Sequence, residues 1–173
     1  MKKRRYATDL SVKPFDANNA QPPEKMTDGA AGFDFYAEEI IKETPRLIWY
    51  RTGYGVRIPR GHFGDLRARS SVSKTGLILA NGAGVVDPDY QGEIQFRFYK
   101  KERDELPAHE TEFPDYVLDG QPYIRKTDVY EPGDRIGQLI LVPFRNDYTG
   151  VTVVEDFKES TERGEGGFGS TGD

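Results

Sequence analysis

The fold is decided by the stretch Glu93-Ile94-Gln95-Phe96-Arg97-Phe98, in which polar and apolar residues alternate strictly. A period of two places Ile94, Phe96 and Phe98 on one face of a β-strand and the polar residues on the other. In residues 138–142, the four residues after Gln138 are apolar, so both faces of the segment are apolar, which is typical of a strand covered on both sides. Further short strands are predicted at residues 32–37, 47–50, 56–58, 63–69 and 151–154.

Glycine and proline punctuate the gaps between these strands, and no segment has a sustained 3.6-residue apolar period. One or two turns of helix near Ser71–Lys74 also fit the sequence. Many short strands with regular turns indicate an all-β protein, either a sandwich, a jelly roll or a small barrel. The 173 residues predict one domain over residues 1–162, followed by a glycine-rich arm at 163–173 that has almost nothing with which to build a core.

Composition excludes several kinds of site and partner. Zero cysteines and two histidines exclude a disulfide scaffold, a cysteine-ligated zinc and a histidine-rich metal site. The net charge of -5 disfavours broad binding to nucleic acid, and the basic residues 2–5 are interpreted as a solvated terminus. No apolar run is long enough to span a membrane or to form a secretory signal after the basic start. We therefore expect a cytoplasmic protein with no membrane or nucleic-acid partner.

Two internal segments carry polar residues in patterns that suit phosphate or water chemistry. Residues 69–71, Arg-Ser-Ser, close a strand and offer one guanidinium and two hydroxyls to a phosphate, although they also fit a surface turn. Further along, Asn81-Gly82 is typical of a hairpin tip, and Val85-Val86 is interpreted as a buried stub. The carboxylate of Asp87 ends that stub and fits either a catalytic role or a turn cap before Pro88.

The glycine-rich arm has a composition that suits phosphate and base binding. Its glycines let the backbone approach an anion closely, and Arg163 adds a charged donor. The ring of Phe168 is able to stack on a base. A flexible terminus remains the other interpretation of the same composition.

Taken together, the segments resemble the motifs of the trimeric deoxyuridine triphosphatases (dUTPases). All five motifs occur in the family order and span most of the chain, at residues 32–37, 69–71, 81–92, 133–140 and 163–172. The resemblance implies a jelly-roll-like β fold and a homotrimer with shared active sites. It also implies hydrolysis of dUTP to dUMP and pyrophosphate, which limits uracil in DNA and supplies dUMP for thymidylate synthesis.

The resemblance implies a role for each matched residue. Asp87 would be the general base that activates water for attack on the α-phosphorus, and Tyr90 would pack under the deoxyribose and exclude a 2′-hydroxyl. The uracil pocket would be formed by Asn81, Val85, Val86 and Gln95. The phosphate chain would be held by Arg69, Ser70, Ser71 and Gln138. From the arm of another subunit, Arg163, Gly169, Ser170 and Thr171 would bind phosphates and Phe168 would cover the uracil.

The resemblance also implies Mg²⁺ as cofactor, held mainly by the triphosphate and by water. No direct protein ligand is expected, and Asp34 would act on the metal through water. Two residues depart from the family pattern: Gly137 stands where alanine is common, and Ser71 where glycine is common. Both replacements are small, so activity is expected to persist.

Two alternatives are weighed against this interpretation. A dCTP deaminase shares the fold and parts of two motifs, but Arg97 aligns with the glutamate that shuttles its protons, and a guanidinium is no base at neutral pH. The second alternative is a protein-binding role for residues 100–128. This charged segment exceeds the usual connection between the third and fourth motifs, and some phage members carry an insertion there. It fits either a protein-binding insertion or a surface decoration.

Overall fold

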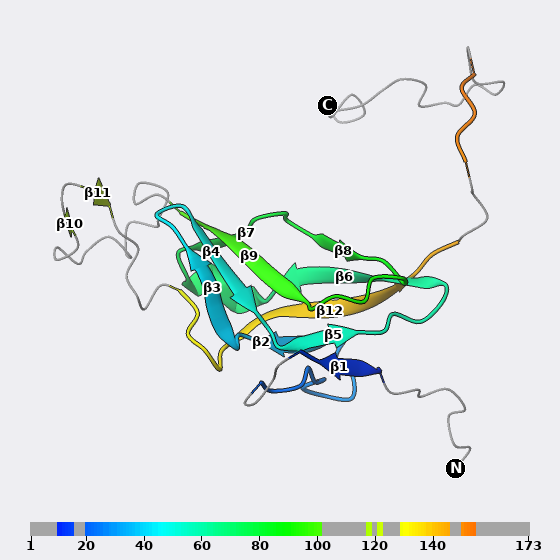
Figure 1. The fold of residues 1–173 in the computed structure, drawn as a ribbon, viewed down its shortest axis with the longest axis horizontal. Coiled ribbons are helices and arrows are strands. Elements are labelled where there is room, and N and C mark those ends of the chain that lie inside the picture. Colours follow the sequence, from blue (N-terminus) through cyan, green and yellow to red (C-terminus); the bar gives the residue numbers. More distant parts are fainter. Residues whose placement is uncertain are drawn as a thin grey trace, which may run out of the picture.

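A computed structural model describes residues 10–15, 20–101, 129–145 and 150–154, together with the backbone of 117–118 and 121–122. Its strands form two four-stranded sheets and two short pairs (Figure 1). The first sheet has the order β2 (Gly32–Tyr36), β12 (Arg135–Pro143), β6 (His62–Ala68), β8 (Gly84–Val86). The second has the order β3 (Glu39–Glu43), β4 (Leu47–Arg51), β9 (Gln95–Lys100), β7 (Leu77–Leu79). The short pairs are β1 (Val12–Pro14) with β5 (Tyr54–Val56), and β10 (Val117–Leu118) with β11 (Gln121–Pro122).

The core forms where the inner faces of the two sheets meet. Ile94, Phe96 and Phe98 are almost fully buried, which confirms the alternation predicted from residues 93–98. From the first sheet, Phe35 brings its ring centroid to 6.2 Å from that of Phe96, and within the second sheet Tyr50 lies 5.9 Å from Phe98. Each buried ring contributes about 1.5–3 kcal/mol, so this aromatic cluster is a main reason why the sheets stay together. Two antiparallel sheets packed in this way confirm the predicted jelly-roll-like, all-β fold.

Gly137 on β12 lies directly against the ring of Phe96. A Cβ atom at this position would come within 2.1 Å of Cε1 of that ring, far closer than two carbon atoms approach. The departure from the alanine common in the family therefore has a packing reason, because the large aromatic residue on the facing sheet occupies the space of the missing methyl group.

The short helix near Ser71–Lys74 is confirmed as a 3-10 helix, η1 (Ser70–Lys74). The strand expected at 56–58 lies earlier in the chain, as β5 (Tyr54–Val56). The strand expected at 151–154 is wrong: these residues form no strand, and Val151 and Val153 are 94% and 92% exposed. Their β-branched side chains favour an extended chain, but they pair with no strand among the residues that the structure describes.

Two expectations about the segment before Asp87 need correction. Asn81-Gly82 is a tight turn with Gly82 at φ 62°, but it joins β7 to β8, which pair in different sheets. It is therefore a crossing between sheets, not the tip of a hairpin. The buried stub is half right, because Val86 is 4% exposed and Val85 is 68% exposed. Successive residues of a strand face opposite ways, so only one of the two reaches the core.

The remaining expectations concern segments at the limits of the described residues. Most of 100–128 and all of 163–173 lie outside them, so the insertion and the arm stay predictions. Within the described residues, no helix combines the length and the apolar character needed to span a membrane. The strand at 138–142 is observed as part of β12, with Leu139 fully buried and Ile140 half-buried in a single copy.

Candidate active site

An open cleft of about 470 Å³ lies where β7, β8 and β9 approach one another. A cleft of this size is typical of small-molecule sites. Its walls include five of the residues expected to contact the nucleoside, Asn81, Val85, Val86, Tyr90 and Gln95, whereas Phe168 lies outside the described residues. Its apolar lining comes from core residues such as Leu66, Ile94 and Phe96. The cleft therefore offers an apolar surface for a flat base, with polar groups around it.

Tyr90 is held in one orientation although its side chain is 46% exposed. Its hydroxyl donates a hydrogen bond to the main-chain carbonyl of Glu93 at 3.0 Å. Its ring lies against Gly92, where a Cβ atom would come within 2.3 Å of the hydroxyl oxygen and 2.5 Å of Cζ. Only glycine leaves room for this close approach of ring to backbone.

Asp87 follows β8 directly and is exposed. Its main-chain carbonyl accepts a hydrogen bond from the N–H of Tyr90 at 3.1 Å, so the two residues begin and end one tight turn. Among the described residues, no ion pair involves its carboxylate, which faces solvent beside the cleft rather than lining it. A carboxylate without a cationic partner in this part of the chain is available to accept a proton from water.

A second polar group forms around Asp34 of β2. This side chain is 8% exposed, and its Oδ2 lies 3.0 Å from Nε of Arg69 and 3.5 Å from Nη1 of Arg135. Arg69 also donates from Nη1 to Oγ of Ser71 at 3.4 Å. On β12, Gln138 is the register partner of Asp34. One carboxylate thus orders two guanidinium groups, and unlike an isolated arginine this pair is preset to meet a phosphate.

Ser70 begins η1 next to Arg69 and is exposed, so its hydroxyl is accessible from solvent. Close by, Tyr130 is buried; burial raises the pKa of its hydroxyl, and its contact with Ser71 and the charge of Arg69 offset part of that rise. The neutral hydroxyl of Tyr130 therefore contributes no negative charge to a group that has to attract an anion.

Three residues in and around the two groups were missed as site residues by the sequence reasoning. Arg135 follows Asp134 in the fourth motif, residues 133–140. Its positive charge within that motif was the signal that could have identified it as a phosphate-binding residue. Arg97 lines the cleft and lies with its guanidinium carbon 3.6 Å from the centroid of Trp49. The indole N–H of Trp49 donates to Oε1 of Gln95 at 3.1 Å. No pattern in the sequence pairs Trp49 with these two residues, because the pairing depends on the register of β4 and β9.

Asp87 and the polar group around Asp34 and Arg69 lie toward opposite ends of strand β6. Strands β6 and β8 are antiparallel, and Gly64 is opposite Val86. Asp87 directly follows Val86, so it lies toward the start of β6. Arg69 follows the other end of β6, five residues past Gly64. At about 3.4 Å per residue, Arg69 and Val86 are separated by about 17 Å along the strand. One copy of the chain therefore does not bring Asp87 and Arg69 to the same phosphate.

The acidic side chains that the structure describes were compared with the needs of a directly bound metal ion. Within the described ranges, no group of three or more His, Asp or Glu side chains is placed to hold an ion. Asp34, the carboxylate expected near the metal, has both of its arginine contacts on Oδ2 and neither on Oδ1. Oδ1 is the oxygen that fits a contact to a metal-bound water.

Comparison with known proteins gives a consistent match along the chain. The dUTPase family model matches residues 18–110 and 124–172, leaving out 111–123 inside the expected insertion. A deoxyuridine 5′-triphosphate nucleotidohydrolase of Desulfitobacterium hafniense is 34% identical over 155 residues, covering 87% of this chain and 86% of the relative. One from Escherichia phage T5 is 36% identical over 158 residues, covering 87% and 90%.

Solved structures agree with the sequence relatives. The dUTPase of Staphylococcus bacteriophage 80alpha, solved with dUPNHPP, superposes with a TM-score of 0.71 at 29% identity. The match covers 95% of this chain and 99% of the phage protein.

Proposed function

This chain belongs to the dUTPase family and hydrolyses dUTP to dUMP, and we propose that it does so with a water molecule activated by Asp87. The cleft carries the proposal, because Asn81, Val85, Val86, Tyr90 and Gln95 all line it and Asp87 directly follows Val86. In the proposed step, the water oxygen bonds to the α-phosphorus and its proton passes to the Asp87 carboxylate. The bond between the α-phosphorus and the bridging oxygen breaks, and pyrophosphate leaves.

Base and sugar selection are proposed to take place in the cleft. Asn81 and the main chain near Val86 and Gln95 would pair with the uracil edge, which presents a carbonyl where cytosine has an amino group. A mismatched base would leave a buried polar group unpaired. Tyr90 would lie under the deoxyribose, and its fixed ring would exclude a ribose 2′-hydroxyl by contact.

Phosphate binding is proposed for the group around Asp34. Arg69 and Arg135 would meet the phosphate oxygens, with the hydroxyls of Ser70 and Ser71 as further donors. Gln138 would contribute from β12 beside Asp34. Mg²⁺, when bound by the triphosphate, would neutralise charge on the phosphate oxygens. Asp34 would orient water around it through Oδ1 and hold the two guanidinium groups through Oδ2.

A homotrimer with active sites shared between subunits is the proposed assembly. The separation of Asp87 from Arg69 within one copy supports it, because a complete site then needs both residues from different copies. The C-terminal arm, residues 163–173, is proposed to close the site of a neighbouring subunit. Its contributions would come from Arg163, Phe168, Gly169, Ser170 and Thr171.

Replacing Asp87 by asparagine tests the catalytic proposal. The amide keeps the shape of the side chain but does not accept the proton, so turnover of dUTP should fall by about 100-fold or more. Binding of a non-hydrolysable dUTP analogue should persist. The assay is release of pyrophosphate from dUTP, with dTTP, dCTP and UTP as comparison substrates. An Asp87→Asn variant that retains near wild-type turnover would remove Asp87 from the mechanism.

Mixing two inactive variants tests the shared site. Asp87→Asn and Arg69→Ala chains, unfolded and refolded together, should regain activity in about one quarter of the sites if each site takes these residues from different copies. Each variant refolded alone is the control. No recovery in co-refolded trimers of confirmed mixed composition would show that one copy supplies both residues.

Deamination of dCTP is the enzymatic alternative. Arg97 lines the cleft where that reaction would need a glutamate, and its guanidinium does not shuttle protons at neutral pH. Incubation with dCTP is therefore expected to release no ammonia.

For residues 100–128 we propose contact with a protein partner. Supporting observations are the charge of this segment and the gap at 111–123 in the family match. Deleting residues 111–123 tests the idea by dUTP turnover and by pull-down. Unchanged results in both would remove it.

A further inference from the structure

The main chain turns sharply between β4 and β5, at Thr52 and Gly53. Gly53 has φ 74°, a left-handed conformation that favours glycine. A Cβ atom there would also meet Cβ of Ala20 at 2.4 Å and Oε2 of Glu38 at 2.7 Å. We call the residues from Arg51 to Tyr54 the β4–β5 corner. Its shape is fixed by a position that accepts only glycine.

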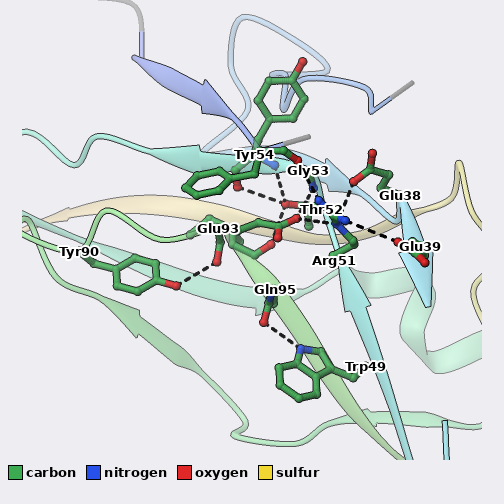
Figure 2. Close-up of polar contacts among 12 residues, drawn as sticks. Glu38, Glu39, Trp49, Arg51, Thr52, Gly53, Tyr54, Tyr90, Glu93 and Gln95 are labelled. Atoms are coloured by element: carbon green, nitrogen blue, oxygen red, sulfur yellow. Dashed lines mark hydrogen bonds and ion pairs between the residues drawn. The ribbon is translucent and has the colours of Figure 1, made fainter. Parts of the chain in front are cut away.

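The corner holds the side chain of Glu93. Oε1 of Glu93 accepts a hydrogen bond from the N–H of Gly53 at 2.6 Å and lies 3.3 Å from Nε of Arg51 (Figure 2). Arg51 also lies 3.1 Å from Glu38 and 3.6 Å from Glu39. Glu93 is 12% exposed and Glu39 is 61% exposed, so solvent screens the Glu39 contact much more.

The guanidinium of Arg51 is the common centre of these contacts. Partial burial lowers its pKa, but the nearby charges of Glu93, Glu38 and Glu39 outweigh this effect and raise it overall. Its Nη2 also donates to the main-chain carbonyl of Phe15 at 2.8 Å. Arg51 therefore stays charged and is fixed from several sides.

The same corner also holds the main chain after Glu93. The N–H of Ile94 donates to the carbonyl of Tyr54 at 2.9 Å, and the hydroxyl of Thr52 donates to the carbonyl of Ile94 at 2.7 Å. Both the side chain of Glu93 and the backbone that follows it are thus anchored to one rigid element.

Tyr90 takes its orientation from this anchored segment. Its hydroxyl donates to the main-chain carbonyl of Glu93, and its ring rests on Gly92, the residue before Glu93. Figure 2 shows the resulting path of contacts, from Arg51 through Glu93 to Tyr90. Within the described part of the chain, this is the one side-chain hydrogen bond that holds the Tyr90 ring.

We propose that Arg51 and Glu93 are positioning residues for sugar selection, because they fix the Tyr90 ring at the distance that admits deoxyribose and excludes ribose. The proposal rests on the proposed function, in which Tyr90 lies under the sugar. Steric exclusion of the ribose 2′-hydroxyl requires that the Tyr90 ring stays in place. A displacement of the ring by about 1 Å would make room for much of a hydroxyl group. Binding of dUTP is less sensitive, because deoxyribose leaves that space empty.

The experiment compares Glu93→Ala, Glu93→Gln and Glu39→Gln. UTP is measured as a competitive inhibitor of dUTP hydrolysis, and discrimination is the inhibition constant of UTP divided by the KM of dUTP. In Glu93→Ala, discrimination should fall by about 10-fold or more, with a smaller change in kcat for dUTP. In Glu93→Gln it should be largely retained, because the amide oxygen still accepts from Gly53. Glu39→Gln, which alters an exposed carboxylate on the same arginine, should match wild type.

Unchanged discrimination in folded Glu93→Ala would overturn the proposal, and so would an equal loss of discrimination in Glu39→Gln. Weakening of UTP and dUTP by the same factor is one form of the first result, because the ratio is then unchanged, and it would show a merely structural role. If Glu93→Ala does not fold, Tyr90→Phe cuts the path at the hydroxyl and should lower discrimination while Arg51 and Glu93 stay paired. In that case, unchanged discrimination in Tyr90→Phe counts against the proposal. The proposed function is judged separately, by wild-type dUTP turnover and its loss in Asp87→Asn.

Discussion

Replacing Gly137 by alanine, the residue common at this place in the family, is expected to destabilise this protein. The new Cβ would lie 2.1 Å from Cε1 and 2.4 Å from Cζ of Phe96, whereas carbon atoms settle at about 3.5–4.0 Å. The ring would have to move by about 1.4 Å to reach the shorter of these distances. It has little room to do so, because Phe96 is 1% exposed and packs against Phe35 and Phe98 at centroid distances of 6.2 and 6.3 Å.

The cost of this overpacking should be about 1–3 kcal/mol, as found when a methyl group is forced into a filled core. In a chain of this size, each kcal/mol corresponds to a shift of about 2–4 °C in Tm, so the midpoint should fall by roughly 5 °C. The expected sign is opposite to the usual gain from a substitution toward the family consensus. Phe96 is the cause, so its replacement should remove much of the effect.

Urea unfolding at one fixed protomer concentration measures this cost, because assembly makes the midpoint depend on concentration. Gly29→Ala is the matched control, since nothing lies within 4 Å of a Cβ there. In a Phe96→Leu background, Gly137→Ala should cost at least about 1 kcal/mol less than in wild type. If Gly137→Ala leaves the free energy of unfolding unchanged or raises it, the steric reasoning is refuted.

Three further predictions concern charge, pH and the site. Asp34→Asn removes the carboxylate shared with Arg69 and should cost about 1–3 kcal/mol of unfolding free energy and lower kcat/KM for dUTP; unchanged values in urea unfolding and steady-state assays would contradict this. Burial raises the pKa of Tyr50, so the stability gained by keeping its hydroxyl neutral is complete below about pH 10 and lost as pH rises toward the raised value. Tyr50→Phe should therefore reduce the fall in Tm at alkaline pH. Parallel curves of Tm against pH for the variant and wild type would contradict this prediction. The fluorescence of Trp49, the only tryptophan, should change on binding a non-hydrolysable dUTP analogue, because its contact Arg97 lines the cleft; a flat titration despite calorimetric binding would exclude this coupling.

Local patterns in the sequence were enough to predict much of the fold. The alternation at residues 93–98 assigned Ile94, Phe96 and Phe98 to the core because burial of one strand face depends only on a period of two. The same reasoning failed at 151–154, since a strand also needs a partner, and a partner is a long-range property. It also counted Val85 as buried, although two successive strand residues cannot both face the core.

The candidate site divides in the same way. Its nucleoside residues were predicted from the family resemblance, and five of them, Asn81, Val85, Val86, Tyr90 and Gln95, line one cleft. The contact between Arg51 and Glu93 spans 42 positions, and no motif links the two residues. The distance between Asp87 and Arg69 could not be predicted from the sequence either, because it follows from the register of β6 against β8.

That register has a genetic consequence. If an active site takes Asp87 from one protomer and Arg69 from another, a defective protomer also affects sites that contain residues of normal protomers. A chain carrying Asp87→Asn that still assembles would occupy places in mixed oligomers and silence sites whose other half is intact. Its harm would then grow with its share of the expressed protein, so such an allele should behave as dominant over the normal one.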